Sequence, residues 1–239
     1  MIPPAGGAGS ATSDDLAGDS PEGSARGEQT VDRRGRRVSA ATAYLKPATG
    51  RRNLDVRSGV LVRRLVFEGR RCVGVEIDHG REPKVIRAHR EVIVSGGTYN
   101  SPHLLMLSGI GPAAHLQGHG IAVLHDSPGV GRNLQEHPTA SLEWNAKAPI
   151  TFLNQLRWDR ILLNAARWAL TGTGPMATQV NSCNVVIRTA AHLERPDLQI
   201  MVNPIRFDAQ TWFPGIKAVQ EHVFWAGLVQ LHPESRGWV

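Results

Sequence analysis

The stretch that decides the fold class is 91–111, Glu91-Val-Ile-Val-Ser-Gly-Gly-Thr-Tyr-Asn-Ser-Pro-His-Leu-Leu-Met-Leu-Ser-Gly-Ile-Gly111. Its β-branched run 92–94 predicts a short strand that is covered on both faces. Gly96-Gly97 follows and permits a sharp turn, Ser101-Pro102 predicts a helix start, and Ser108-Gly109 predicts the helix end. This order is typical of α/β folds. It suits phosphate binding at a helix N-terminus, although an ordinary βα turn has the same pattern.

Composition bounds the class of protein. The 239 residues are enough for one large domain or two small ones, and 41% apolar with 20% charged residues is typical of a soluble globular protein. The net charge of +6 arises from arginine pairs in turns, such as Arg33-Arg34 and Arg70-Arg71, so we expect no nucleic-acid partner. With no long apolar run and no secretory pattern, we expect no transmembrane segment and a cytoplasmic location.

Several kinds of site are not expected. Cys72 and Cys183 lie far apart, which argues against structural zinc, an iron–sulfur cluster or a disulfide framework. No histidine pair has metal-ligand spacing on a helix, and no G-x-S-x-G motif supports a serine hydrolase. Gly7-Ala8-Gly9 is not a dinucleotide fingerprint, because no strand precedes it and Thr12 stands where the third glycine belongs.

The elements before the central stretch follow from local patterns. Residues 1–38 are rich in small and polar residues and predict a loosely ordered N-terminal segment. Residues 39–45 predict a short helix that ends before Pro47. Residues 60–67 and 72–78 predict the two strands of a hairpin, with a turn at Glu68-Gly-Arg70.

The second half of the chain has a different pattern. Residues 155–171 carry spaced leucines and arginines and predict an amphipathic helix that Gly172 ends. After the central stretch we also expect a short helix and then a strand; the ranges are 112–118 and 121–124. Three later strands without crossover helices predict an antiparallel sheet; the ranges are 184–188, 198–202 and 223–231.

The run from Gly97 to Gly111 resembles the second signature of the glucose–methanol–choline (GMC) oxidoreductases, and in particular their choline-dehydrogenase-like members. These are FAD-dependent enzymes that oxidise alcohols. Residues 53–76 and 128–137 also resemble blocks of this family. The resemblance implies an α/β fold, with a partial FAD-binding, Rossmann-like domain at 39–145. Part of an α+β substrate domain with an antiparallel sheet is then expected at 146–239.

The resemblance also implies site residues. Val62 would lie against the adenine of FAD and bond it through its backbone, although a core strand residue would give the same pattern. Gly96 and Gly97 would pack beside the flavin and the first βα unit of the family fold. Asn133 and His137 would lie near the flavin ring and the substrate cavity. A histidine such as His137 is also a common hydrogen-bonded structural residue.

The function implied is oxidation of a CH–OH group of a small-molecule alcohol by hydride transfer to FAD. Two blocks of the family do not appear in the sequence: the first dinucleotide fingerprint and the C-terminal histidine block. We therefore assign no catalytic residue here and expect this chain to be inactive alone. The alternative is a truncated non-catalytic remnant, or a split-gene subunit that associates with the missing fragments.

Overall fold

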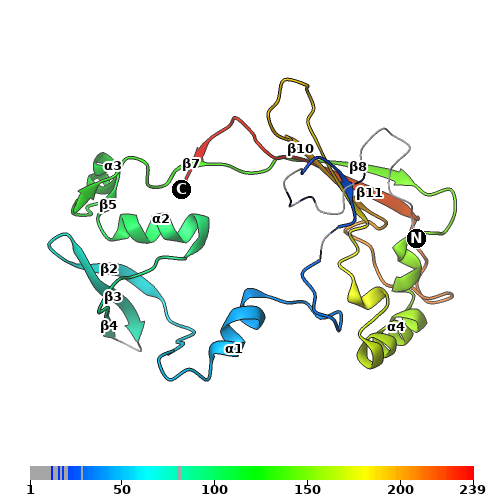
Figure 1. Ribbon diagram of the computed structural model, residues 1–239, viewed down its shortest axis with the longest axis horizontal. Coiled ribbons are helices and arrows are strands. Elements are labelled where there is room, and N and C mark those ends of the chain that lie inside the picture. Colours follow the sequence, from blue (N-terminus) through cyan, green and yellow to red (C-terminus); the bar gives the residue numbers. More distant parts are fainter. Residues whose placement is uncertain (1–11, 13–15, 17, 19–20, 28, 80–81) are drawn as a thin grey trace. The chain divides into compact units, whose positions relative to one another are not determined.

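The structure is a computed structural model that describes residues 12, 16, 18, 21–27, 29–79 and 82–239. Its chain divides into two units, both visible in Figure 1. Residues 1–50 and 137–233 form one, here called the sheet unit, and residues 51–136 and 234–239 form the other, the hairpin unit. The predicted domain ranges stay a prediction, and Gly7-Ala8-Gly9 lies outside the described residues. No helix in the described part of the chain is long and apolar enough to cross a membrane.

The hairpin unit contains a three-stranded antiparallel sheet in the order β2-β3-β4. Its strands are β2 (Val62–Glu68), β3 (Arg71–His79) and β4 (Glu82–Arg87). The predicted hairpin is confirmed, and Gly69 takes a φ of 59° in its turn, a conformation that favours glycine. Ile77 of β3 is 2% exposed and lies in the core of this unit. Because β3 is the only strand paired with β2 among the described residues, β2 is an edge strand.

Helix α2 (Gly97–Leu107) begins four residues before the predicted start. Gly96 is its N-cap, and the Gly96 N–H donates to Ser101 Oγ at 3.0 Å. Ser101 therefore accepts a hydrogen bond from the N-cap residue although it lies inside the helix. Pro102 lies within the helix, which lacks one i→i−4 hydrogen bond there. The predicted end is confirmed, because Ser108 is the C-cap residue and Gly109 follows at a φ of 84°.

The strand predicted at 92–94 is not formed. Residues 91–96 pair with no described strand, and Ile93 is 78% exposed. β-branched residues favour a strand only where neighbouring strands provide hydrogen bonds and packing, and none is present here. The strand predicted at 121–124 is also wrong. Instead, the short strand β6 (His125–Asp126) pairs in parallel with β5 (Ile110–Gly111), and the predicted helix between them is confirmed as α3 (Ala113–Gly118).

The sheet unit contains a five-stranded sheet in the order β1-β9-β10-β11-β8, with every pairing antiparallel. Its strands are β1 (Gly23–Ala25), β8 (Thr139–Asn145), β9 (Cys183–Ile187), β10 (Leu198–Asn203) and β11 (Val223–Gln230). The predicted antiparallel sheet is confirmed. Its register places Ile200 opposite both Val185 and Leu228. The N-terminal segment contributes the edge strand β1, whose Ser24 is buried.

Helix α4 (Trp158–Thr171) confirms the predicted amphipathic helix, and Gly172 ends it in the left-handed conformation. The predicted helix end before Pro47 is wrong, because the π-helical turn η1 (Ala41–Leu45) continues into α1 (Lys46–Ala48). Proline fits there, since its fixed φ suits the first positions of a helix. The remaining elements are η2 (Phe152–Leu156), η3 (Pro175–Ala177), β7 (Arg132–Leu134) and β12 (Gly237–Trp238).

Candidate cofactor site

A cavity in the hairpin unit has a volume of about 820 Å³. It lies between the start of β2, the extended segment 92–96 and one face of α2. Its walls are mainly aliphatic, with a few polar groups; the lining residues are Val60, Leu61, Val62, Arg63, Leu65, Val75, Asp78, Val92, Ile93, Val94, Ser95, Gly96, Asn100, His103, Leu104 and Leu107. This size and this mixture are typical of a small-molecule or cofactor site.

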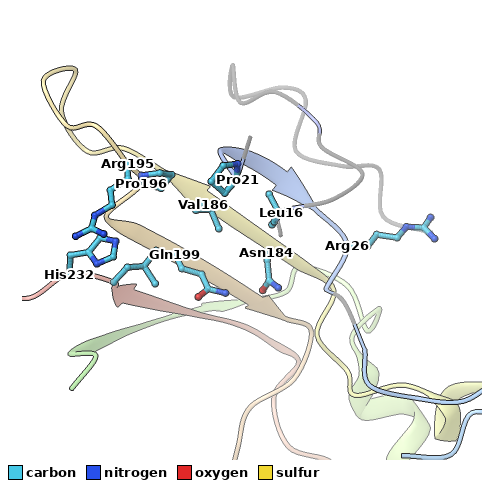
Figure 2. Close-up of a pocket in the computed structure, with 10 residues that line it drawn as sticks. Leu16, Pro21, Arg26, Asn184, Val186, Arg195, Pro196, Gln199 and His232 are labelled. Carbon is cyan, nitrogen blue, oxygen red and sulfur yellow. The ribbon is translucent and has the colours of Figure 1, made fainter. Parts of the chain in front are cut away.

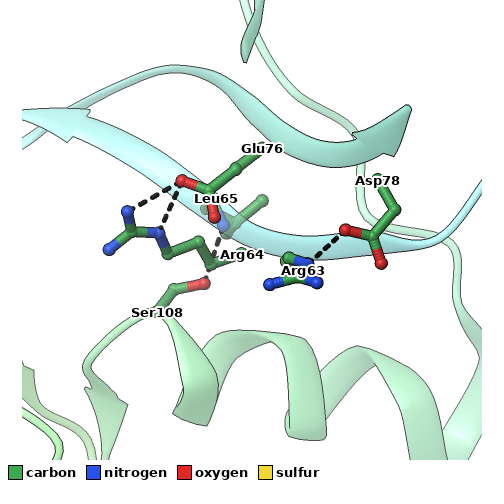
Figure 3. Close-up of polar contacts among 6 residues, drawn as sticks. All are labelled: Arg63, Arg64, Leu65, Glu76, Asp78 and Ser108. Atoms are coloured by element: carbon green, nitrogen blue, oxygen red, sulfur yellow. Dashed lines mark hydrogen bonds and ion pairs between the residues drawn. The ribbon is translucent and has the colours of Figure 1, made fainter. Parts of the chain in front are cut away.

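Ser108 joins the strand and the helix that form two of the walls. Its Oγ accepts a hydrogen bond from the Leu65 N–H of β2 at 2.8 Å and donates one to the Leu104 carbonyl of α2 at 2.6 Å. Figure 3 shows Ser108 at the end of α2, directly beneath Leu65 of the strand. The outer edge of β2 is therefore held by a helix terminus rather than by another strand.

Two cross-strand ion pairs neutralise the charges of the hairpin near the cavity (Figure 3). Arg63 pairs with Asp78, and both line the cavity. Arg64 pairs with Glu76 at 2.7 Å, and the hydrogen bonds that its guanidinium donates to this carboxylate raise the pKa of Arg64. Because these arginines already have carboxylate partners, this wall suits a neutral flat ring better than a phosphate group.

Glycine is favoured at positions 96 and 97, at the start of α2, by two different constraints. A Cβ added at Gly96 would lie 3.1 Å from the Cβ of Asn100, so this position is tight. A Cβ at Gly97 would meet nothing within 4 Å, but its φ of 83° is in the left-handed region. Backbone conformation alone therefore requires glycine at position 97.

The structure brings together only part of the predicted site. Val62 and Gly96 line the same cavity, and Gly97 begins α2 beside it. Asn133 lies in β7 at a φ of 58°, exposed and not on the cavity wall. His137 is exposed and belongs to the sheet unit. The roles assigned to these residues stay predictions.

Sequence reasoning missed two polar residues of the cavity. Asn100 and His103 project from the same face of α2 as Leu104 and Leu107, and all four line the cavity. Their spacing of three, four and seven residues is the signal of one helix face. That signal was hidden by the predicted helix start at 101, which left Asn100 in a turn.

A second cavity, of about 450 Å³, lies in the sheet unit. It contains cationic side chains, yet Figure 2 shows Arg195 and His232 at one end and Arg26 pointing away at the other. The cations therefore do not converge on one ligand position. Within the described ranges, no group of three or more histidine, cysteine, aspartate or glutamate residues could hold a metal ion.

The range that matches a known family covers the first cavity in full and only Leu16, Pro21 and Arg26 of the second. Residues 4–139 match the GMC oxidoreductase family, and this range includes every residue that lines the cavity of the hairpin unit. The chain belongs to the GMC oxidoreductase family. We therefore take the cavity beside α2 as the candidate cofactor site.

The oxygen-dependent choline dehydrogenase of Brucella canis is 44% identical over 234 residues, which is 97% of this chain and 41% of that protein. The chain thus spans about two fifths of the length of this relative. Among solved structures, pyridoxine 4-oxidase from Mesorbium loti is similar with a TM-score of 0.68 and 28% identity, covering 91% of this chain and 38% of that one. An Aspergillus oryzae formate oxidase, studied for its FAD modification, gives a TM-score of 0.79 at 23% identity, covering 95% and 43%. The latter likeness concerns the fold alone.

Proposed function

We propose that this chain forms part of an FAD-dependent oxidoreductase that acts on the CH–OH group of a small alcohol, with choline as the first substrate to test. The observation that carries the proposal is the cavity built by Val62, the glycine turn and the lining face of α2, all within the family match. The chain spans 41% of the Brucella canis relative, so we propose the activity for the full-length protein. We assign no catalytic residue in this chain and propose that the chain alone is inactive.

The residues present fit the adenine end of FAD. Aliphatic side chains of β2 and α2, such as Leu65 and Leu104, provide apolar walls for a flat ring. Asn100 and His103 supply polar groups on the wall formed by α2. On the wall formed by β2 and β3, the ion pair of Arg63 with Asp78 balances the charge. When bound, FAD supplies the hydride acceptor, while the protein supplies binding and orientation. In this proposal the hairpin unit holds and orients the adenine.

The first experiment is the visible spectrum of two purified proteins, the full-length protein and the chain of 239 residues. We expect the full-length protein to show flavin absorbance near ~450 nm that bleaches when choline is added without oxygen. We expect neither property in the chain alone. A full-length protein without flavin would contradict the proposal, and stoichiometric flavin in the chain alone would contradict its inactivity.

A second experiment tests the cavity itself. Leu104→Trp in the full-length protein places an indole in the cavity, and we expect the flavin content to fall well below that of the wild type. The matched control is Leu170→Trp on the exposed face of α4, which should leave the flavin content unchanged. If the folded Leu104→Trp protein contained as much flavin as the wild type, this cavity would not be part of the cofactor site.

The segment 91–96 supports association with other parts of the family fold. Val92 and Val94 are half-buried and Ile93 is exposed, and this run pairs with no strand that the structure describes. An extended segment with apolar side chains and unpaired backbone N–H and C=O groups readily pairs with another strand. We propose that it pairs with a strand outside this chain, either in the full-length protein or in a separate subunit. The cytoplasmic location also stays a prediction.

A further inference from the structure

One hydroxyl group connects two walls of the candidate cofactor site. Ser108 Oγ is hydrogen-bonded to the Leu65 N–H and to the Leu104 carbonyl, at 2.8 and 2.6 Å. Leu65 lies on β2 and Leu104 on α2, and both line the cavity, whereas Ser108 does not. Any influence of Ser108 on a ligand must therefore act through these two residues.

The hydrogen bond to Leu65 has no substitute in the strand pairing. Leu65 is 7% exposed, and the edge of β2 that carries this N–H faces away from β3 toward the helix terminus. A buried backbone donor on an edge strand requires an acceptor, and the serine hydroxyl provides it. Without the hydroxyl, this part of β2 would lose its fixed distance from α2.

The position of the hydroxyl is itself fixed by the chain around it. The Ser108 N–H bonds the carbonyls of Leu104 and Leu105 at 3.2 and 3.0 Å, which holds the residue against the last turn of α2. Gly109 follows in the left-handed region, where an added Cβ would lie 2.5 Å from the Ala122 carbonyl oxygen. The hydroxyl therefore lies on a rigid helix end rather than on a mobile loop.

We propose that Ser108 is a positioning residue that sets the separation between β2 and α2, and so shapes the cavity for the adenine end of FAD. Val62 lies on the same strand, three residues before Leu65, so the anchor acts close to the strand start that lines the cavity. This inference rests on the proposed function, because it assumes that the adenosine half of FAD binds there.

The test uses the full-length protein after removal of its flavin. The dissociation constants of FAD and FMN are measured for the wild type, Ser108→Ala and Ser108→Thr. FMN has the same flavin but no adenosine, so it reports on the rest of the site. We expect Ser108→Ala to weaken FAD binding roughly tenfold, with FMN binding unchanged, because one buried N–H loses its acceptor. Ser108→Thr retains the hydroxyl and should recover most of the affinity.

A matched control separates this effect from the loss of a helix-end hydrogen bond. Thr171 Oγ1 donates to the Arg167 carbonyl at 2.7 Å at the end of α4, the same i→i−4 contact that Ser108 makes in α2. Thr171→Val removes that contact far from the cavity in sequence and should leave FAD binding unchanged. Hydrogen exchange of the Leu65 amide should become faster in Ser108→Ala alone.

The outcomes distinguish the two proposals. Faster exchange at Leu65 with unchanged FAD affinity would overturn the positioning role of Ser108. Equal losses for FAD and FMN, without recovery in Ser108→Thr, would show a general structural defect and would also overturn it. A wild type that binds FMN as tightly as FAD would instead remove the adenine site on which both proposals rest.

Discussion

The two units of the chain satisfy the edges of their strands in different ways. In the sheet unit, β10 pairs with β9 on one side and β11 on the other, and both partners come from this chain. Among the described residues of the hairpin unit, β2 pairs with β3 alone, its outer edge bonds a serine hydroxyl, and segment 91–96 pairs with no strand. A β-branched run therefore becomes a strand here only where the chain supplies its partner.

The units also have separate cores. The sheet unit buries Val223, Trp225 and Val229 along one of its five strands, β11. The hairpin unit buries Ile77 beneath its small sheet and Leu116 in α3. Because each core contains few large side chains, one truncation should remove a large part of a unit's stability.

The largest expected effect is at Trp225, whose ring lies 4.4 Å from that of Phe207, centroid to centroid, at 75°. Trp225→Ala should destabilise the sheet unit by about 3–5 kcal/mol through lost burial and the cavity left behind. Chemical denaturation followed by far-UV circular dichroism measures it. The control Trp238→Ala removes an exposed indole and should stay within about 0.5 kcal/mol of the wild type. A loss below about 1 kcal/mol at Trp225 would contradict the central role of β11.

The next effect compares two glycines of the hairpin unit, one at each end of α2. Gly97 and Gly109 have φ values of 83° and 84°, but only Gly109 is crowded, by the Ala122 carbonyl oxygen. Gly97→Ala should cost about 1 kcal/mol from backbone conformation alone. Gly109→Ala should cost roughly 2–4 kcal/mol, because a contact at 2.5 Å forces the backbone to move. Chemical denaturation of both variants measures these losses. If Gly97→Ala and Gly109→Ala lowered the denaturation midpoint equally, the contact with the Ala122 carbonyl oxygen would be relieved without a cost in stability.

These differences explain which parts of the fold could be predicted from the sequence. Strands β9, β10 and β11 of the sheet unit and helix α4 follow from patterns whose partners lie within the chain, whereas β1 and β8 were not predicted. The same holds for the hairpin around Gly69. The strand predicted at 92–94 failed because propensity does not report whether a partner is present. The early start of α2 was missed because a left-handed glycine at 97 is not visible in a pattern that already offers Ser101-Pro102.

The candidate site could be predicted only in part, for a similar reason. Val62 and Gly96 were found through the family resemblance, and both line the cavity. Asn100, His103 and the Arg63–Asp78 pair depend on where α2 begins and on how β2 and β3 are aligned. Neither the start of α2 nor the alignment of β2 with β3 can be inferred from a local sequence motif. The link through Ser108 joins residues 43 positions apart, so it required the tertiary structure.

A smaller effect on stability, but a clear one on association, is expected at Ile93. In the chain alone, Ile93→Lys should reduce self-association, because a charge on an unpaired apolar run opposes edge-to-edge pairing. The free energy of unfolding should change by less than about 0.5 kcal/mol, since the side chain is exposed. Light scattering during size-exclusion chromatography measures the association. The control is Ile150→Lys, since Ile150 is similarly exposed and lies outside any strand. An equal reduction in this control would mean that exposed hydrophobic surface causes the association and the unpaired segment does not.

The smallest effect concerns the connection between β9 and β10 in the sheet unit. Asp197 accepts hydrogen bonds from the Thr189 hydroxyl at 2.6 Å and the Thr189 N–H at 2.7 Å. These bonds lower the pKa of Asp197, with a smaller contribution from His232. A carboxyl whose pKa is lower in the folded state contributes stability above its unfolded pKa of about 3.9, and this is lost as pH falls through the folded pKa.

Thr189→Val removes the hydroxyl donor, so the pKa of Asp197 should rise toward its ordinary value, as measured by an NMR titration of the carboxyl carbon. The sheet unit of this variant should then lose less stability between about pH 4 and the folded pKa than the wild type does. Asp197→Asn should abolish this part of the pH dependence. If the titration of Asp197 is the same in Thr189→Val, the hydroxyl does not lower the pKa, and the remaining side-chain contact is the one that Asp197 accepts from the Thr189 N–H. In that case the two units would resemble each other here, because in each a side-chain oxygen accepts a hydrogen bond from a backbone N–H, as Ser108 does from Leu65.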